Sequence, residues 1–374
     1  MSKVRLGDVA IEVRETSKCP EGLPVVGLEH LLPSEITLTQ WSDTSDNTFN
    51  KLFHKGQILF GRRRAYLKKA AVAPFDGVCS GDITVIAAKP ERLLTELLPF
   101  IISNDAFFDY AMEKSAGSLS PRVKWAQLAE YEFDLPELEE QQKLANLLWA
   151  MERTRKAYQD LLIQADELVK SQFVEEIQSL IDADATVLLD DLIDDDRPIT
   201  YGILKPGTGF AGGIPVVKVK DMRDGIIDES DLLLTSPDID QAYQRSKLRA
   251  GDLLISIRGS IGRMAEVPDS LQDANITQDT ARLSVKPAYN RVYLRGVLES
   301  APMQRDMEKN IRGVAVKGIN IGYLRNLPIP MPGRDRQDAL AQLYIQTDKS
   351  KLAIRQALES LEKSRSAIMT KVFG

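Results

Sequence analysis

Two long stretches of this sequence repeat their apolar residues at helical spacing and contain no glycine or proline. The first runs from Glu137 to Ile181, with Pro136 before it and glutamates in its first turn, where the helix dipole favours carboxylates. Steps of seven give two series, Leu144, Met151, Tyr158 and Ala165, and Leu147, Thr154, Leu161 and Leu168. This stripe predicts one helix of about 65 Å that packs along a partner helix.

A second stretch of the same kind lies at residues 335–374. It has no glycine or proline between Asp335 and Phe373, and steps of seven give Leu340, Thr347, Ile354, Leu361 and Ile368. Two helices with narrow apolar seams, each following a globular segment, predict an antiparallel pair. Periodicity alone leaves an alternative open, in which the two are unrelated core helices of one large domain.

The segments before these helices, residues 1–136 and 182–334, have the pattern of mixed domains. Short extended runs, such as Gln57–Phe60 and Ile83–Ala88, alternate with glycine, proline and aspartate turns. A helix is predicted from about Glu91 to Lys114, because apolar residues recur there at helical spacing. The sequence therefore predicts strands and helices in both segments.

The two mixed segments repeat each other in order. Leu6-Gly-Asp-Val matches Leu189-Asp-Asp-Leu, Leu23-Pro-Val-Val matches Ile214-Pro-Val-Val, and Lys55-Gly-Gln-Ile-Leu matches Ala250-Gly-Asp-Leu-Leu. Residues 117–136 align without a gap with residues 313–332. Since loops change length while the order is kept, we predict an α+β protein with two pseudo-repeated mixed α/β domains, each followed by a long helix.

Length and composition bound the class of protein. At 374 residues the chain is long enough for two domains with cores, and 43% hydrophobic and 27% charged residues are an ordinary balance for a soluble protein. No apolar run reaches transmembrane length, and the N-terminal residues lack a signal-peptide pattern. Cys19 and Cys79 show neither paired nor metal-binding spacing. We therefore expect a cytoplasmic protein.

The net charge of −6 argues against a nucleic-acid binder unless positive charge is concentrated locally. Residues 182–196 hold seven aspartates, an acidic joint that carries much of the negative charge. Residues 51–75 hold seven lysines and arginines and no acid. That run is either a solvated strand face or a phosphate-binding surface. The loop at residues 117–125, rich in small hydroxyl residues, is either a second phosphate contact or a plain loop tip.

Motifs of catalytic sites are missing from the sequence. Gly207-Thr-Gly-Phe-Ala-Gly matches a dinucleotide-binding pattern, but the extended run Gly213–Val217 follows it where a helix is required. There is no P-loop, and His30 and His54 do not stand at metal-ligand spacing with the cysteines. Neither an amino-methyltransferase box nor a nuclease acidic cluster occurs. This pattern is typical of a protein that reads a target and leaves it unchanged.

Together these motifs resemble the DNA-specificity (S) subunits of type I restriction–modification systems, along essentially the whole chain. Two halves of one form carry the resemblance, Gly117…Pro121-Arg-Val…Leu135-Pro and Gly313…Lys317-Gly-Ile-Asn…Ile329-Pro-Met-Pro, with Ala274-Asn-Ile-Thr-Gln and Tyr201-Gly-Ile-Leu-Lys-Pro. The sequence departs from the pattern where the second helix begins, since Arg334-Asp-Arg-Gln stands where the first has Glu139-Glu-Gln-Gln. It is also short for the family.

The resemblance implies two target-recognition domains, at residues 1–136 and 182–334, that each read half of a bipartite double-stranded DNA site. It implies two spacer helices, at residues 137–181 and 335–374. The chain would be a non-catalytic subunit that docks two modification (methyltransferase) subunits and, in some complexes, two restriction subunits. Those partners would use S-adenosylmethionine and ATP with Mg²⁺ in DNA methylation and phage defence, and we expect no cofactor or metal in this chain.

We expect the basic loops to bind DNA, because arginine pairs with guanine, asparagine pairs with adenine, and lysine holds phosphates. The candidate DNA-binding residues are Arg62, Arg63, Arg64, Tyr66, Lys68, Ser120, Arg122, Lys124, Lys205, Lys218, Lys220, Arg258, Ser260, Arg263, Lys317 and Asn320.

Apolar residues of the helices that lie off the predicted seam are candidates for partner docking or for ordinary packing. They are Trp149, Ile163, Phe173, Tyr344 and Ile345. Two other classes of function remain open at this point, a stand-alone nucleic-acid-modifying enzyme and a helical adaptor that does not bind DNA.

Overall fold

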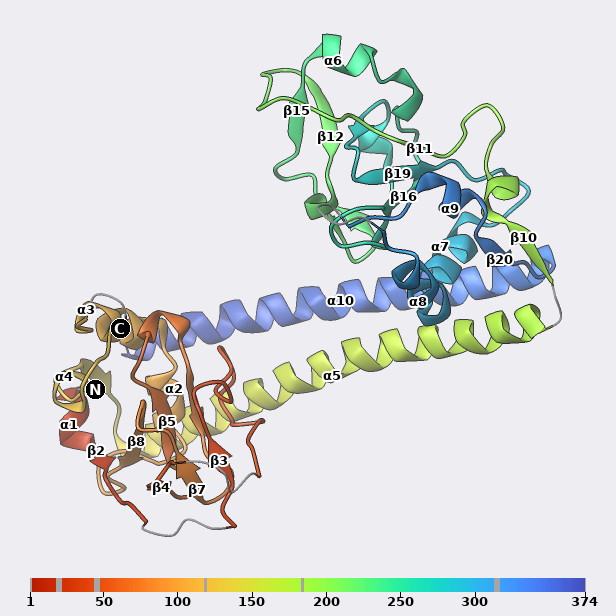
Figure 1. Ribbon diagram of the computed structural model, residues 1–374. Helices are drawn as coiled ribbons and strands as arrows, with labels where there is room; N and C mark the ends of the chain where they lie inside the picture. Colours follow the sequence, from red (N-terminus) through yellow and green to blue (C-terminus); the bar gives the residue numbers. More distant parts are fainter. Residues whose placement is uncertain are drawn as a thin grey trace. The chain divides into compact units, whose positions relative to one another are not determined.

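The computed structural model describes residues 2–17, 22–43, 48–117, 120–182, 185–312 and 317–373. The chain forms two compact units, Met1–Asp160 with Arg355–Gly374 (unit 1), and Leu161–Ile354 (unit 2). Each unit contains one of the predicted mixed domains and a part of both long helices (Figure 1). The sequence assigned the helices to segments of their own, whereas each helix part belongs to the core of the unit that it adjoins.

Unit 1 begins with short strands and ends with helices. Its elements before the long helix are β1 (Ser2–Arg5), α1 (Leu6–Val9), β2 (Ala10–Val13), β3 (Val25–Val26), β4 (Lys51–Phe53), β5 (Ile58–Gly61), η1 (Ala65–Leu67), β6 (Ala70–Val72), β7 (Gly77–Cys79), β8 (Ile83–Ala88), α2 (Leu98–Ile102), α3 (Asp105–Glu113), α4 (Trp125–Leu128) and β9 (Glu132–Leu135). A four-stranded antiparallel sheet has the order β2-β8-β5-β6, and a three-stranded sheet has the order β3-β7-β4.

The central strand β5 shows how unit 1 is layered. Ile58 and Phe60 point into a core formed with the helices, while Leu59 points into a second core between the two sheets. Side chains alternate along a strand, so a strand that is apolar throughout is buried on both faces. Cys79 lies in the second core, and burial raises the pKa of its thiol to about 12. Cys19 lies outside the described residues.

The helix predicted from Glu91 to Lys114 is instead two short helices, α2 and α3. Pro99 stands in the first turn of α2, where a residue without an N–H group is tolerated, and a helix cannot run through it from the N-terminal side. The chain leaves helical geometry again at Ser103 and Asn104 before α3 begins. Apolar side chains of these helices, among them Phe100 and Phe107, are in the core.

Unit 2 repeats this layout with more insertions. Its elements outside the long helices are β10 (Thr186–Leu188), η2 (Leu189–Leu192), β11 (Thr200–Tyr201), β12 (Ile214–Val217), η3 (Val219–Asp221), β13 (Met222–Arg223), β14 (Ile226–Ile227), β15 (Leu233–Thr235), α6 (Pro237–Gln241), η4 (Gln244–Ser246), β16 (Leu253–Ser256), β17 (Met264–Glu266), η5 (Asp269–Leu271), β18 (Asn275–Ile276), β19 (Thr280–Leu283), α7 (Arg291–Glu299), α8 (Ala301–Lys309), α9 (Ile321–Arg325) and β20 (Pro328–Pro330).

The strand order confirms the internal repeat. The sheet β11-β19-β16-β17 corresponds to β2-β8-β5-β6, and the parallel pair of β12 with β18 corresponds to that of β3 with β7. Ile58 pairs with Ile86 as Leu253 pairs with Leu283, so matched registers extend to single residues. The extended run after the glycine-rich loop is β12, which agrees with our rejection of a dinucleotide site there.

The acidic joint is more ordered than its charge suggested. Residues 183 and 184 lie outside the described part, but β10 and η2 follow, and β10 pairs with β20. Leu189 and Leu192 are fully buried, and Asp190 lies 3.7 Å from the Arg325 side chain. Apolar residues between the aspartates therefore anchor this segment in the core of unit 2, while Asp190, Asp191, Asp195 and Asp196 are exposed to solvent.

The two long helices are α5 (Leu138–Asp182) and α10 (Arg334–Phe373), within one residue of the predicted bounds. Their segments run antiparallel inside each unit. In unit 2, Lys351 contacts Asp166 at 2.7 Å and Arg336 contacts Glu176 at 2.8 Å, so residue numbers rise along one helix as they fall along the other. In unit 1, Met369 and Phe373 join the core that contains Leu148.

One of the two predicted series of α5 lies one residue away from the buried stripe. Leu147, Leu161 and Leu168 are 46–54% exposed, whereas Leu148 and Val169 are buried. The predicted positions of α10 are buried or half-buried throughout. The other predicted series of α5, Leu144, Met151, Tyr158 and Ala165, is buried or half-buried as expected. The Leu147 series failed because polar residues, among them Glu152 and Arg155, take inward positions on this helix.

Those inward polar residues of α5 form ion pairs. Arg155 and Glu152 contact each other at 2.7 Å with side chains that are only 7% and 2% exposed. Glu35 and Arg365 lie 3.3 and 3.7 Å from this pair. Burial without such partners would be costly, so the pair fixes which faces of the two helices meet in unit 1.

Candidate nucleic-acid interface

The two basic segments singled out in unit 1 lie together. The loop between β5 and β6 contacts the loop before α4, since Arg64 N–H donates to the Pro121 carbonyl at 2.9 Å and Val123 N–H donates to the Arg62 carbonyl at 3.0 Å. A bridge also joins Arg63 to Arg122. The two loops lie about 60 residues apart in the sequence, so their contact could not be inferred from either of them. Residues 118 and 119 of the second loop lie outside the described part.

One carboxylate holds the arginines of this surface. Asp82, the residue directly before β8, accepts from Arg122 Nε at 2.8 Å and lies 3.5 Å from Arg63 Nη1. The hydrogen bond from Arg122 lowers the pKa of Asp82. Arg63 Nε also donates to the Ser120 hydroxyl. Sequence reasoning missed Asp82, because an aspartate in a Ser-Gly-Asp turn has the composition of any turn.

Arg64 and Tyr66 project from a strained turn. The residues that flank η1, Arg64 and Lys68, have φ values of 55° and 49°, a left-handed conformation that side-chain-bearing residues rarely adopt. Tyr66 is 54% exposed, and Arg64 and Lys124 are also exposed. Lys68 instead contacts Asp105. The side chains available to a ligand in unit 1 are therefore Arg64, Tyr66 and Lys124, with Arg122 half-exposed.

Unit 2 builds the same arrangement from the matching segments. Arg258 bridges Gly318, and Ile319 N–H donates to the Ile257 carbonyl at 2.9 Å, so the loop after β16 meets the loop before α9. Asp279, which corresponds to Asp82, lies 3.8 Å from Arg258. Gln278, also missed by sequence reasoning, accepts from Arg258 at 3.0 Å. Residues 313–316 lie outside the described part.

The candidate residues of unit 2 differ in how free their side chains are. Lys205, Lys317 and Ser260 are exposed. Arg263 donates to the carbonyls of Val219 and Met222 at 3.2 and 3.1 Å. It therefore holds the loop after β16 against η3 and β13, and the donating nitrogen is not free for a ligand.

Two further side chains of this group have partners within unit 2. Lys220 pairs with Asp221 and Asp231, both at 3.3 Å. Asn320 caps α9, with its side-chain oxygen accepting from Gly322 N–H at 2.7 Å, and a bidentate contact to adenine would break that cap. Lys218 is half-buried beside η3.

A groove of about 750 Å³ runs beside the Arg258 loop. It is lined by Gly259, Ser260, Arg263 and Lys220, and by Arg223, a cation that sequence reasoning missed. Arg223 precedes the turn Asp224-Gly225, in which both residues have positive φ values of 50° and 80°. An Asp-Gly pair between short apolar runs predicts such a hairpin, so this signal was present in the sequence.

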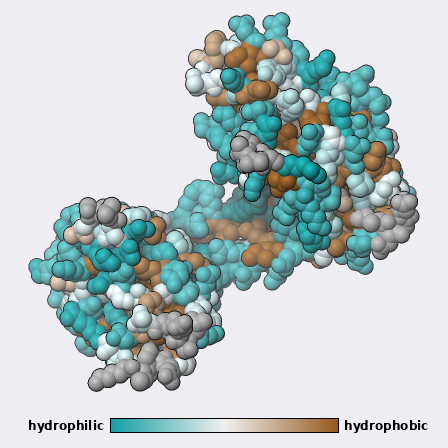
Figure 2. All heavy atoms as spheres, viewed as in Figure 1, coloured by the Kyte–Doolittle hydropathy of each residue, from teal (hydrophilic) through white to brown (hydrophobic). Residues whose placement is uncertain are grey.

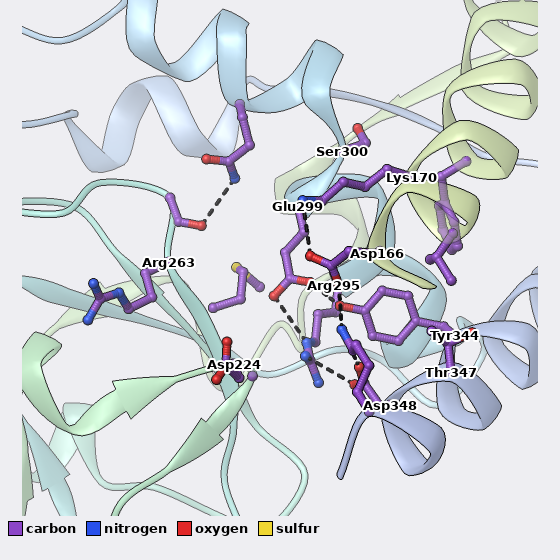
Figure 3. A pocket seen from close by; sticks show the side chains of 18 residues that line it. Asp166, Lys170, Asp224, Arg263, Arg295, Glu299, Ser300, Tyr344, Thr347 and Asp348 are labelled. Atoms are coloured by element: carbon purple, nitrogen blue, oxygen red, sulfur yellow. Dashed lines mark hydrogen bonds and ion pairs between the residues drawn. The ribbon is translucent and has the colours of Figure 1, made fainter. Parts of the chain in front are cut away.

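A second cavity of unit 2, of about 320 Å³, lies where α7 meets the long helices. Figure 3 shows Arg295 among Glu299, Asp348 and Tyr344, and the guanidinium lies 3.2 Å from Glu299 and 3.4 Å from Asp348. Lys351 is likewise paired with Asp166. Because the charges of its wall are matched, this cavity is best understood as a polar junction between the domain and the helices.

The predicted docking residues on the helices fall into two groups. Phe173 and Tyr344 are 1% and 8% exposed and lie in the core of unit 2, so their assignment to outer helix faces is wrong. Their rings pack on each other at 5.9 Å, which explains why large apolar residues stand there. Trp149 packs against Phe100 and donates to the Glu96 carbonyl at 2.8 Å. Ile163 is 57% exposed, and Ile345 is half-buried.

Three exposed leucines of α5 were instead assigned to the seam, and Leu352 of α10 was assigned neither to the seam nor to docking. Figure 2 shows apolar surface along the long helices, and Leu147, Leu161, Leu168 and Leu352 are 46–54% exposed. Within unit 2, Leu161 and Leu168 stand seven residues apart on α5 and therefore share one face. These four leucines are called the exposed helix leucines below, and Ile163 is considered together with them.

Within the described ranges, no group of three or more histidine, cysteine, aspartate or glutamate side chains is arranged to hold a metal ion. Among the helices that the structure describes, none is both long and apolar enough to cross a membrane. His54 is instead placed between Glu15 and Asp76, at 3.0 and 3.2 Å, and the hydrogen bond with Glu15 raises its pKa.

Comparison with known proteins relates this arrangement to one family. Residues 3–164 match the family model described as type I restriction modification DNA specificity domain. The chain is 31% identical over 216 residues to the Escherichia coli type I restriction enzyme EcoBI specificity subunit, covering 56% of this chain and 45% of that protein. It is 32% identical over 92 residues to the Escherichia coli EcoDI specificity subunit, covering 25% and 20%. The chain thus matches less than half the length of these relatives.

Solved structures extend the likeness of fold to both units. One solved structure comes from work on complex assembly and conformational transition of the type I R-M system. It has a TM-score of 0.57 at 21% identity, and the match covers 99% of this chain and 97% of that chain. The type I restriction–modification S subunit from M. genitalium has a TM-score of 0.61 at 13% identity, covering 100% and 96%. The solved structures show a shared fold, and the family match over residues 3–164 with the two specificity-subunit relatives agrees with the resemblance drawn from the sequence.

Proposed function

We propose that this protein is the non-catalytic, sequence-reading subunit of a type I restriction–modification complex and that it acts in the cytoplasm. Each mixed domain reads one half of a bipartite double-stranded DNA site. The observation that carries the proposal is the pair of matching basic surfaces, one in each unit, where two loops join and an aspartate, Asp82 or Asp279, lies beside the arginines. A surface that is built twice from corresponding segments suits a target with two parts.

Within unit 1, the side chains divide between two roles. Arg64 and Tyr66 are exposed at the tip of the η1 turn, where an arginine fork can pair with a guanine edge and a tyrosine ring can pack on sugar or base. Lys124 is an exposed point charge suited to phosphate. Arg63 and Arg122 are held through Asp82, so they position the surface and add to its positive charge.

The test is DNA binding by the purified chain as a function of salt. Lys124→Ala should lower the slope of log affinity against log salt by about one, and Arg64→Ala should weaken binding by about 1–3 kcal/mol at one base position only. Arg63→Ala and Arg258→Ala should weaken the two half-sites separately. Lys143→Ala on α5, which removes an exposed cation paired with Glu139 and Glu140, is the matched control and should leave the slope unchanged. Equal effects of Lys124→Ala and Lys143→Ala would contradict the assigned surface.

The long helices, in this proposal, set the gap between the two half-sites. Joining two weak reading surfaces raises the effective concentration of the second once the first is bound, but only if the distance fits. Deleting seven residues from both α5 and α10 keeps the seam in phase and shortens each helix by about 10 Å, or about three base pairs. We expect the preferred gap to shrink by that amount while both half-site sequences stay the same.

We propose that the exposed helix leucines and Ile163 dock the modification subunits, two per chain because the structure is duplicated, and in some complexes restriction subunits. S-adenosylmethionine and ATP with Mg²⁺ would bind in those partners. Ile163→Asp should abolish co-purification with the modification subunit and leave DNA binding by the isolated chain intact. Tyr344→Phe, a change in the core, should leave co-purification unaffected, and loss of partner binding in that variant alone would contradict the docking surface.

A further inference from the structure

A strongly basic cavity of about 590 Å³ lies in unit 2, outside the loops assigned to DNA reading. It is lined by residues from the start of β11, the segment around η4, strand β19 and the end of α9. Its charged lining residues are the cations Arg197, Arg245, Lys247, Arg249, Arg282 and Arg325, and the acids Asp196 and Asp273. Cations therefore outnumber acids in its wall by six to two.

Part of this positive charge is balanced from behind the wall. Arg197 forms a bidentate pair with Asp252, with both contacts at 2.8–2.9 Å, and Lys247 lies 2.8 Å from Asp240. Asp252 and Asp240 do not line the cavity. These pairs fix two of the cations in place and leave the remaining arginines to determine the charge that the cavity presents.

Arg282 is the buried centre of the cavity wall. Its residue is 3% exposed, and its guanidinium donates only to backbone carbonyls, those of Arg245, Lys247 and Pro198 at 2.7, 3.0 and 3.2 Å. No acidic side chain pairs with it among the residues that the structure describes. Burial, together with the neighbouring charge of Arg197, lowers its pKa to about 10. A buried guanidinium without an acid is costly, and an anion in the cavity would stabilise it.

Two donors of the wall also lack an acceptor. The Nε atoms of Arg282 and Arg325 are both buried and have no hydrogen-bond partner. Arg325 has Asp190 at 3.7 Å, beyond hydrogen-bond distance, and uses another nitrogen for the Ile199 carbonyl. Buried donors are normally paired, and here two unpaired ones belong to the same cavity.

The fold itself does not require these arginines. In unit 1 the position of Arg282 is held by Val85, because Val85 pairs with Val13 and Leu59 as Arg282 pairs with Thr200 and Leu254. The position of Arg325, at the end of α9, is held by Ala129 at the end of α4, with Trp125 matching Ile321. The same strands and helix turn thus form with a valine and an alanine, so the cationic wall is a feature that only the second domain has at these positions.

We propose that this cavity binds a phosphate group. Guanidinium forks match the oxygens of a tetrahedral oxyanion, and converging arginines can donate several charge-assisted hydrogen bonds to one phosphate. The phosphate is either one of a nucleic-acid backbone or that of a free phosphate compound, since both present the same oxygens. The proposal goes beyond the reading of DNA bases and holds whether or not the basic loops carry out that reading.

The test uses the full chain with inorganic phosphate and pyrophosphate as probes, by calorimetry at constant ionic strength set with chloride. Wild type should bind, and Arg325→Ala and Arg282→Val, which install the residues of unit 1, should each weaken binding at least about tenfold. Arg305→Ala removes an exposed cation of α8 outside the cavity and should bind like wild type.

The proposal is overturned if wild type binds neither probe or if Arg325→Ala binds as tightly as wild type. Arg282 donates hydrogen bonds to three backbone carbonyls, so circular dichroism is used to check that Arg282→Val folds. If that variant does not fold, the affinity of Arg325→Ala alone decides whether the cavity binds phosphate. A short duplex DNA then identifies the source. Displacement of phosphate by the duplex assigns the cavity to a backbone phosphate, whereas simultaneous binding assigns it to a free phosphate compound.

Discussion

Removing Glu152 should destabilise unit 1 far more than removing both members of its ion pair. Glu152 and Arg155 contact each other at 2.7 Å with side chains that are 2% and 7% exposed. Glu152→Ala leaves the Arg155 charge in the seam with only Glu35, at 3.3 Å, to balance it. Breaking a buried pair in this way costs about 3–5 kcal/mol. For a unit of this size, the midpoint of thermal unfolding should fall on the order of 10 °C.

The double variant Glu152→Leu with Arg155→Met replaces both charges by apolar groups of similar size. Such replacements are often neutral or stabilising by about 1–4 kcal/mol, so the double variant should recover most of the stability lost by Glu152→Ala. Urea unfolding followed by circular dichroism measures both variants. Asp166→Ala removes the partner of Lys351 in unit 2, but Asp166 is 44% exposed, and this control should cost less than about 1 kcal/mol. Equal losses in the single and double variants would refute a buried-charge origin of the effect.

Three further outcomes follow from particular contacts. Asp82→Asn should weaken half-site binding because Arg63 and Arg122 lose their shared carboxylate, and footprinting should show the second half-site unaffected. Since the pKa of Asp82 is lowered from 3.8, its contribution to stability is present above that pH and is lost below it, so the stability difference between wild type and Asp82→Asn should vanish in acid titration. Gly225→Ala should destabilise unit 2 by more than the roughly 1–3 kcal/mol of backbone strain alone, because its Cβ would lie 1.5 Å from the Arg295 guanidinium. Gly259→Ala, also at positive φ but with open space around its Cβ, is the matched control, and similar losses in thermal unfolding would exclude the clash.

Features set by local spacing were predictable from the sequence. The bounds of α5 and α10 came within one residue, because a run of about forty residues without glycine or proline leaves few other structures open. The duplication of the mixed domain was also predictable, because matching segments recur in the same order. The contact between the loops of Arg63 and Arg122 was not predictable from either loop, since it depends on how the sheet and α4 pack together.

Features set by charge inside the protein were not predictable. A periodicity of apolar residues points toward leucines, and on α5 it selected Leu147, Leu161 and Leu168, which are exposed. The inward face carries Glu152 and Arg155, whose burial depends on each other and on Glu35, a residue far away in the sequence. For the same reason the basic cavity around Arg282 gave no signal, because its cations come from four separate segments.

The completion of unit 1 by Arg355–Gly374 bears on how the protein is made. Met369 and Phe373 belong to the same core as Phe133, whose ring lies 6.2 Å from that of Phe373. A ribosome delivers these residues only after the entire second domain has been synthesised. The half that is translated first is therefore finished last, and until then its apolar surface is left open to solvent, chaperones and neighbouring chains.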